Sequence, residues 1–248
     1  MRLAGWFFLV PCLFSCGPGA VLYTDDVFAA AAPEIQRAWE SLAPFRNVRT
    51  HPLPEGAGLA EISAALKADP PSTAMIGLAL APADRRALMT GFPHVRLVFF
   101  QTGVGDSQIV VNRLEAWKLV ARAAGPTSAA AVLFPADTSE SERAEFLAVL
   151  KSQGDSAVTS WVWPELGNLA GAKTIFQWVG APADSRFLAL GPGPVVHGLP
   201  GTVRAPGARG LTWKIRESGL GDFLWNTVQP GTKGSHFLPL ETVPTDHE

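Results

Sequence analysis

Short apolar runs alternate with amphipathic helical patterns along most of the chain. Residues 20–23 form the first apolar run, and Ile35, Trp39 and Leu42 then recur at helical spacing. An apolar run of this length, followed by polar residues and a helical pattern, is typical of a strand that is buried on both faces of a parallel sheet. The alternation therefore predicts an α/β fold in which parallel sheets are flanked by helices.

The same alternation continues toward the C-terminus. Further strands are expected at residues 47–53, 75–80, 95–100, 108–111 and 129–134. Helices are expected around Ile62, over residues 83–90, and after Asn112, whose side chain suits an N-cap. Ser139 and Glu142 form a capping box that opens another helix.

The two halves of the chain repeat a short pattern. The run Ala-Val-Leu-Tyr at residues 20–23 recurs as Ala-Val-Leu-Phe at residues 131–134, and each run is followed by an aspartate at the same distance. Pro-Glu at 54–55 recurs at 164–165, and Ala-Pro-Ala-Asp at 81–84 recurs at 181–184. A chain rich in alanine and proline also produces such matches by chance. The order of the three matches favours two similar lobes, residues 16–110 and 111–248.

Glycine and proline are concentrated near the C-terminus. Residues 191–248 contain 10 Gly and 7 Pro, and this density interrupts regular elements. We expect a loop-rich segment there, with a strand at 213–215, a helix at 221–228, and a frayed tail at 242–248.

The N-terminal residues resemble a targeting segment. Arg2 is followed by an uncharged run at residues 3–14, which is too short to span a bilayer and suits a secretory signal. Residues 13–16, Leu-Phe-Ser-Cys, resemble a bacterial lipobox, in which Cys16 accepts lipid such as palmitate after removal of the signal peptide, residues 1–15. This resemblance implies a lipid-anchored protein of the bacterial cell envelope, periplasmic or at the outer surface. The alternative is an ordinary signal cut near Gly17 or Ala20.

Composition excludes several classes of function. Cys12 and Cys16 are the only cysteines, so a disulfide-stapled fold and a cysteine-built zinc site are excluded. The formal net charge of −2 does not favour a nucleic-acid partner. The five histidines lack metal-binding spacing, and no nucleophile elbow, P-loop or dinucleotide motif is present. We expect no catalytic residues, no metal and no cofactor, and hence a protein that is not an enzyme.

The remaining class of function is the binding of a ligand. Ligands of open parallel sheets sit beyond the carboxyl ends of the strands. The expected ligand-binding residues follow such strands or carry aromatic rings: Asp25, Asp26, Phe28, Gln101, Asp137, Trp161 and Trp163. Carboxylates accept hydrogen bonds from hydroxyl groups, and aromatic rings offer flat apolar surfaces. The alternative roles are helix capping for Asp26 and Asp137, and core packing for the two tryptophans.

Three stretches resemble the type I periplasmic binding proteins of ABC importers, and within them the basic membrane protein family, which includes nucleoside-binding lipoproteins. They are Thr-Asp-Asp-Val-Phe at 24–28 with Ala-Trp-Glu-Ser-Leu at 38–42, residues 76–97, and residues 110–117. The resemblance implies that Asp25, Asp26 and Phe28 face a small polar ligand, nucleoside or sugar-like, held between the two lobes. It also implies delivery of that ligand to an ABC permease in the membrane.

The chain also departs from this family pattern. No Asn or Gln directly follows Phe28, and the glycine-rich strand end expected in the second lobe is Phe-Pro-Ala at 134–136. The alternative function is therefore a structural or interaction lipoprotein that keeps the fold but has no transport ligand.

Overall fold

The computed structural model describes residues 19–105, 107–155, 157–165, 169, 171–178, 195–199 and 210–245. Cys16 and the expected signal segment, residues 1–15, lie outside these ranges, so both the signal peptide and the lipidation remain predictions. The chain divides into two compact units. Unit 1 comprises residues 1–110 and 219–236, and unit 2 comprises residues 111–218 and 237–248.

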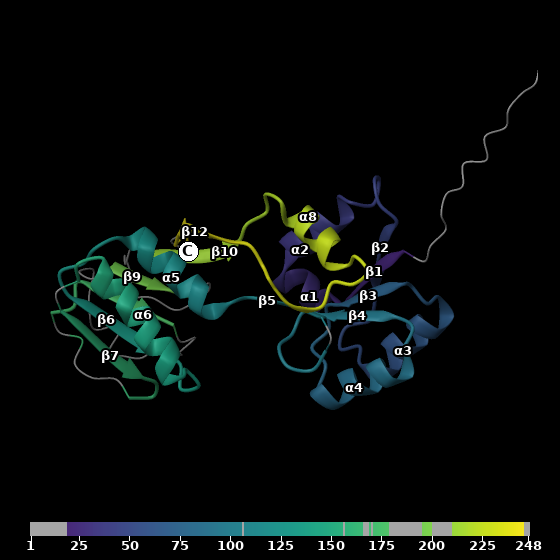
Figure 1. Cartoon of the computed structure of the whole chain (residues 1–248), viewed down its shortest axis with the longest axis horizontal. Helices are drawn as coiled ribbons and strands as arrows, with labels where there is room; N and C mark the ends of the chain where they lie inside the picture. Colours follow the sequence, from purple (N-terminus) through teal and green to yellow (C-terminus); the bar gives the residue numbers. More distant parts are fainter. Residues whose placement is uncertain are drawn as a thin grey trace, which may run out of the picture. The chain divides into compact units, whose positions relative to one another are not determined.

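Unit 1 is a six-stranded sheet covered by helices on both faces (Figure 1). The strands follow the order β11-β5-β4-β3-β1-β2, and the neighbouring pairs from β2 to β5 are parallel. Helices α1, α2 and α8 lie on one face, and α3 and α4 lie on the other. The bounds are β1 Ala20–Thr24, α1 Asp26–Ala31, α2 Pro33–Glu40, β2 Val48–Pro52, α3 Leu59–Ala68, β3 Thr73–Ile76, α4 Pro82–Gly91, β4 Arg96–Phe99, β5 Ser107–Val110, α8 Leu220–Thr227 and β11 Gly234–Phe237.

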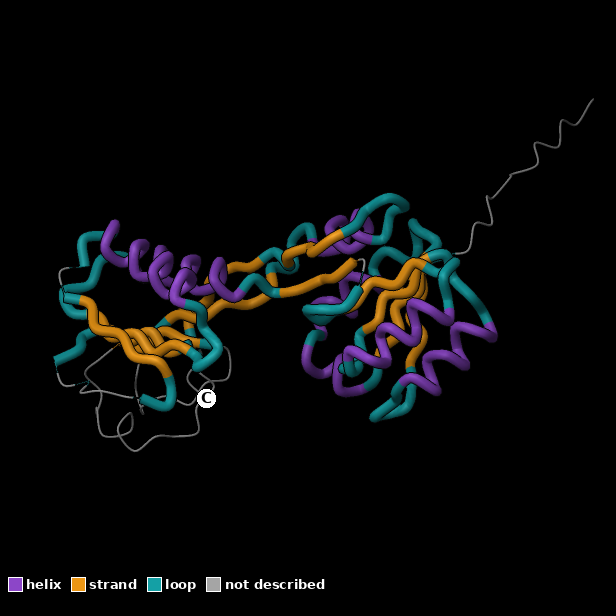
Figure 2. The backbone as a smooth tube through the Cα atoms, turned by 60° about the horizontal axis from the view of Figure 1, so that its bottom comes forward, coloured by secondary structure: helices purple, strands orange, loops and turns teal. Residues whose placement is uncertain are grey.

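Unit 2 contains a four-stranded parallel sheet in the order β7-β6-β8-β9 and a separate antiparallel pair, β10 with β12. Helices α5 and α6 run side by side along one face of the parallel sheet (Figure 2). The bounds are α5 Arg113–Ala124, β6 Ala130–Phe134, α6 Glu140–Ser152, β7 Val158–Val162, β8 Thr174–Gln177, β9 Val195–Gly198, β10 Leu211–Ile215 and β12 Leu240–Pro244.

The repeated sequence pattern coincides with equivalent strands. β1 pairs with β2 and β3, just as β6 pairs with β7 and β8, and all five residues of each central strand are buried. The amide of Leu53 donates to the carbonyl of Thr24 at 2.7 Å, and Trp163 donates to Phe134 at 2.9 Å in the matching place. The third match, at 181–186, lies outside the described residues.

A cluster of aromatic side chains fills the core of unit 2. Trp117 stacks on Trp178 with ring centroids 5.6 Å apart, and Phe146 meets both Phe134 and Trp178 edge-on. Edge-on and offset contacts are the favourable geometries for such rings. The predicted fold class, α/β with parallel sheets flanked by helices, is confirmed.

Several finer expectations were wrong. Residues 219–236 pack with unit 1, whereas the second lobe was expected to extend unbroken to residue 248. The expected frayed tail at 242–248 contains much of β12, because residues 240–244 pair with β10. In the glycine-rich segment, the expected strand at 213–215 and helix at 221–228 are observed as β10 and α8. β9, β11 and β12 were not expected there, and they form because long-range strand pairing overrides local propensity.

Candidate ligand-binding site

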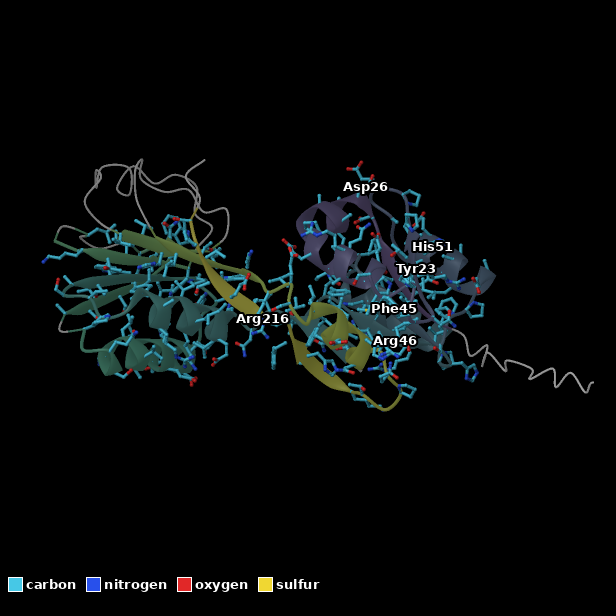
Figure 3. The ribbon with its side chains drawn as sticks, turned by 90° about the horizontal axis from the view of Figure 1, so that it is seen from above. Tyr23, Asp26, Phe45, Arg46, His51 and Arg216 are labelled. Atoms are coloured by element: carbon cyan, nitrogen blue, oxygen red, sulfur yellow. The ribbon has the colours of Figure 1, made fainter. Side chains whose placement is uncertain are left out.

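The carboxyl ends of β1, β3 and β4 share one edge of the unit 1 sheet, because these strands are parallel. Asp25 directly follows β1 and caps α1: the amide of Phe28 donates to its Oδ1 at 2.8 Å. Asp26, for which helix capping was the alternative role, is instead the first residue of the helix and is exposed. Its carboxylate points away from the body of the unit in Figure 3. One carboxylate is thus fixed at this edge, and the other is open to solvent.

An aromatic pair lies beside these carboxylates. The rings of Phe28 and Phe100 have centroids 5.0 Å apart and are tilted by 56°. Gly77 follows β3 and makes this arrangement fit, because a Cβ at Gly77 would lie 2.8 Å from the Phe28 ring. Its amide donates to the carbonyl of Tyr23 at 2.8 Å. Sequence reasoning missed both Gly77 and Phe100, although each sits directly after or within an expected strand.

Gln101 follows Phe100 and is partly committed to the protein. Its Oε1 accepts a hydrogen bond from the amide of Leu80 at 3.1 Å, which ties the loop after β4 to the segment after β3. The expectation that Gln101 faces a ligand stays a prediction. The observed bond gives this side chain a positioning role at the same edge.

Arg85 and Gln108 hold the rest of that loop. Arg85 is 4% exposed on α4, and its Nη1 donates to the carbonyls of Thr102 at 2.9 Å and Val104 at 3.3 Å. Gln108 on β5 donates through Nε2 to the carbonyl of Gly103 at 2.9 Å and accepts from its amide at 3.1 Å. The sequence signal for Arg85 is its helical spacing from Leu88, which puts an arginine on the apolar face of α4. That position indicates that Arg85 bonds to groups inside the protein.

Tyr23 and His51 occupy paired positions on β1 and β2, and both are labelled in Figure 3. Their ring centroids are 5.2 Å apart. Burial raises the pKa of the Tyr23 phenol, so this group stays protonated and its ring serves as packing beneath the carboxyl edge.

In unit 2, Asp137 is held by an arginine. Arg113 Nη1 donates to Asp137 Oδ2 at 2.7 Å and makes a two-pronged ion pair with Glu142, with both N–O distances 3.0 Å. The guanidinium lowers the pKa of Glu142 to about 2, and these hydrogen bonds raise the pKa of Arg113. Asp137 therefore shares the single positive charge of Arg113 with Glu142, and it is not the N-cap of α6, which is Ser139.

Trp161 and Trp163 pack against the protein. Both are half-buried against a cluster of Ala131, Leu133, Leu169, Ile175 and Val196. Trp161 pairs with Leu133 in the sheet register, and Trp163 follows the strand end. Their rings contribute to the core on the face of the sheet opposite the aromatic cluster, and their part in ligand binding stays a prediction.

The seven expected residues thus fall into two sets. Unit 1 brings Asp25, Phe28 and the Gln101 loop to one edge with Asp26 beside them, and Asp137 and the two tryptophans belong to unit 2. In the described ranges, no group of three His, Cys, Asp or Glu side chains is placed to hold a metal. Three cavities found among these ranges lie elsewhere. They measure about 450 Å³ near His197, about 300 Å³ near Phe92, and about 250 Å³ near Leu119.

Comparison with known proteins identifies the fold. No protein-family model matches the sequence, and no curated protein matches it. Solved structures do: a periplasmic ribose ABC transporter structure from Conexibacter woesei has a TM-score of 0.61 at 15% identity, covering 92% of both chains. An ABC transporter, LacI family transcriptional regulator from Brachyspira murdochii has a TM-score of 0.57 at 11% identity, covering 92% of this chain and 95% of that one.

A third similar structure is the LacI family transcriptional regulator CCPA from Weissella paramesenteroides, with bound sucrose. Its TM-score is 0.55 at 9% identity, covering 90% of this chain and 96% of that one. The chain therefore has the fold that these periplasmic binding proteins and LacI-type regulators share. A fold like that of type I periplasmic binding proteins was predicted from the sequence. The finer resemblance to basic membrane proteins stays a prediction. Among the described residues, no helix is long and apolar enough to cross a bilayer.

Proposed function

We propose that this chain is a lipid-anchored solute-binding protein of an ABC-type importer, which takes a small polar ligand at the carboxyl edges of its sheets. The observation that carries the proposal is the edge of unit 1, where Asp25, the Phe28–Phe100 pair and the Gln101 loop converge. The ribose transporter structure with the same fold supports a sugar-like ligand. The resemblance to basic membrane proteins supports a nucleoside.

The chemistry of the edge suits either ligand class. A sugar or nucleoside presents ring hydroxyl groups, which donate hydrogen bonds to carboxylates such as Asp25 and Asp26. A sugar ring or a base has an apolar face that stacks on an aromatic side chain, and the half-buried Phe28 and Phe100 rings supply such a surface. Transport then requires that the loaded protein meet a permease in the membrane, which the lipid anchor at Cys16 would favour.

Thermal unfolding of residues 16–248 against sugars, nucleosides and amino acids tests ligand binding. A ligand present at 100 times its Kd stabilises the folded state by about 2.7 kcal/mol, so a true ligand raises the Tm. Asp25→Asn keeps an N-cap side chain at α1, since Asn caps as well as Asp, and removes only the charge. We expect Asp25→Asn to reduce the ligand-induced shift. The exposed Glu40→Gln, at the far end of α2, is the matched control that keeps it.

A second function has its own supporting observations. Asp137 is paired with Arg113, Gln101 accepts from Leu80, and the tryptophans pack on the core. Polar and aromatic groups that are satisfied internally suit an interaction or structural lipoprotein without a transport ligand. No Tm shift across the whole library favours this function over the first.

The anchor is tested separately. Expression of the full chain in a bacterium fed an alkyne fatty acid is expected to label the protein, and Cys16→Ser is expected to abolish the label. Cys12→Ser is the matched control, because Cys12 lies within the signal segment that is removed. Labelling that survives Cys16→Ser contradicts the proposed anchor.

A further inference from the structure

The amino edge of the unit 1 sheet lies where the described chain begins. Gly19 precedes β1, and the amide of Ala20 donates to the carbonyl of Asn47 at 3.0 Å. The contact is tight, because a Cβ at Gly19 would lie 2.3 Å from that carbonyl oxygen. The turn that precedes β2 therefore sits directly beside the entry of the N-terminal segment.

That turn presents an exposed aromatic ring. Phe45 is 83% exposed, the largest exposure among the described large hydrophobic side chains. Its backbone is held in place, since its amide donates to the carbonyl of Leu42 at 2.9 Å. The guanidinium of the neighbouring Arg46 lies over the Trp225 ring, with its Cζ 4.8 Å from the ring centroid. An exposed ring on a fixed turn suggests contact with something outside the unit.

Basic side chains lie on the elements that meet at this edge. Arg46 and Arg49 flank the start of β2, and Lys67 lies in the last turn of α3. Acids on the adjoining elements include Glu40, which ends α2, Asp222 in the first turn of α8, and Asp69, which pairs with Arg49 at 2.5 Å. Phe45 and Arg46 precede the amino end of β2, whereas Asp26 follows the carboxyl end of the parallel strand β1, and Figure 3 shows Asp26 well apart from them on unit 1.

Chain length restricts what this edge can meet. Two residues, Gly17 and Pro18, separate Cys16 from Gly19. The path from Cys16 to Gly19 is therefore three residue steps, and a fully extended chain spans about 3.3–3.6 Å per step. A lipid attached to Cys16 therefore holds Gly19 within about 10 Å of the membrane surface. Aromatic rings settle at the lipid–water interface, and basic side chains are attracted to anionic headgroups.

We propose that the amino edge of unit 1, formed by Phe45, Arg46, Arg49 and Lys67, rests on the lipid headgroups of the anchoring membrane, with the Phe45 ring inserted at the interface. This inference rests on the proposed anchor at Cys16. It orients unit 1 with its amino edge on the bilayer and its carboxyl edge, with Asp25 and Phe28, away from it.

The test uses residues 16–248, in which Cys16 is the only cysteine. Cys16 is coupled to a maleimide lipid in vesicles of phosphatidylcholine and phosphatidylglycerol. Phe45 is replaced by p-azidophenylalanine and labelled with an environment-sensitive fluorophore. The matched control carries the same label at Val27, which is 59% exposed at the carboxyl edge of the same unit. Circular dichroism of both labelled proteins checks that they are folded.

We expect a blue shift of the label at position 45 on vesicles, quenched by nitroxide-bearing lipid, and no change at position 27. Equal emission on vesicles and in solution at position 45, or equal shifts at both positions, overturns the proposal. A shift without vesicles that grows with protein concentration also overturns it, and indicates contact between copies of the chain. Because the coupling is chemical, these results depend neither on lipidation in cells nor on solute binding.

Discussion

Replacing Gly77 with alanine places a methyl group where the Phe28 ring now lies. The new Cβ would be 2.8 Å from both Cγ and Cδ1 of Phe28 and 3.0 Å from its Cδ2. Carbon atoms prefer separations of about 3.5–4.0 Å, so the overlap is about 0.7 Å. The affected atoms lie at the base of the ring and not at a flexible tip, and the whole side chain has to move.

The expected cost is a loss of about 1–3 kcal/mol in the free energy of unfolding, the usual range for overpacking. Part of this loss comes from the contact between the Phe28 and Phe100 rings, which the displaced Phe28 side chain would lose. Aromatic pairs of this kind contribute about 0.5–1.5 kcal/mol to stability. Urea unfolding measures the loss as a lower midpoint at an unchanged slope. Gly91→Ala is the matched control: it adds the same methyl group at the end of α4, where a Cβ meets nothing within 4 Å.

A double-mutant cycle tests whether the clash with the Phe28 ring causes the loss of stability. In a Phe28→Ala background the ring is gone, so Gly77→Ala is expected to cost little. An equal loss with and without the ring would refute the assignment of the clash to Phe28. If Phe28 faces the ligand, Gly77→Ala also weakens ligand binding, which the Tm shift reports.

Four further substitutions have expected outcomes. Ser139→Ala removes the N-cap of α6 and is expected to cost about 1 kcal/mol in urea unfolding. Phe146→Ala empties the centre of the unit 2 aromatic cluster and is expected to cost about 3–5 kcal/mol. The pKa of Glu142 is lowered to about 2, so its contribution to stability is complete above its ordinary pKa of 4.5 and is lost as the pH falls toward 2. Glu142→Gln should flatten that acid-side decline, and an unchanged profile would contradict it. Arg96→Lys removes donors to the carbonyls of Thr227, Gln229 and Thr232, and hydrogen exchange at residues 227–236 should accelerate.

Much of the fold was predictable because its signals are local. The runs at 20–23 and 131–134 are continuous and apolar because β1 and β6 are buried on both faces. The capping residues Asn112 and Ser139 also act on groups three residues away, and both are observed caps. Such interactions join residues that are close in the sequence, so they can be predicted from the sequence alone.

The return of residues 219–236 to unit 1 was not predictable in this way. Arg96 holds the carbonyls of Thr227 and Gln229, and Thr73 donates to the carbonyl of Val228, all across more than a hundred residues. β12 likewise exists because β10 supplies its partner. No periodicity within either segment signals these contacts, since their free energy comes from groups distant in the sequence.

The candidate site also has features that follow from local sequence and features that depend on contacts in space. Apolar runs mark where strands end, so the positions of Asp25, Asp26 and Phe28 after one buried strand, and of Gln101 after another, follow from the amino-acid sequence. Three features needed the folded structure: Asp25 rather than Asp26 caps α1, Phe100 meets Phe28 over Gly77, and Arg113 pairs with Asp137. Partner choice depends on distances between side chains in space, and those distances are set only when the strands pair and the helices pack.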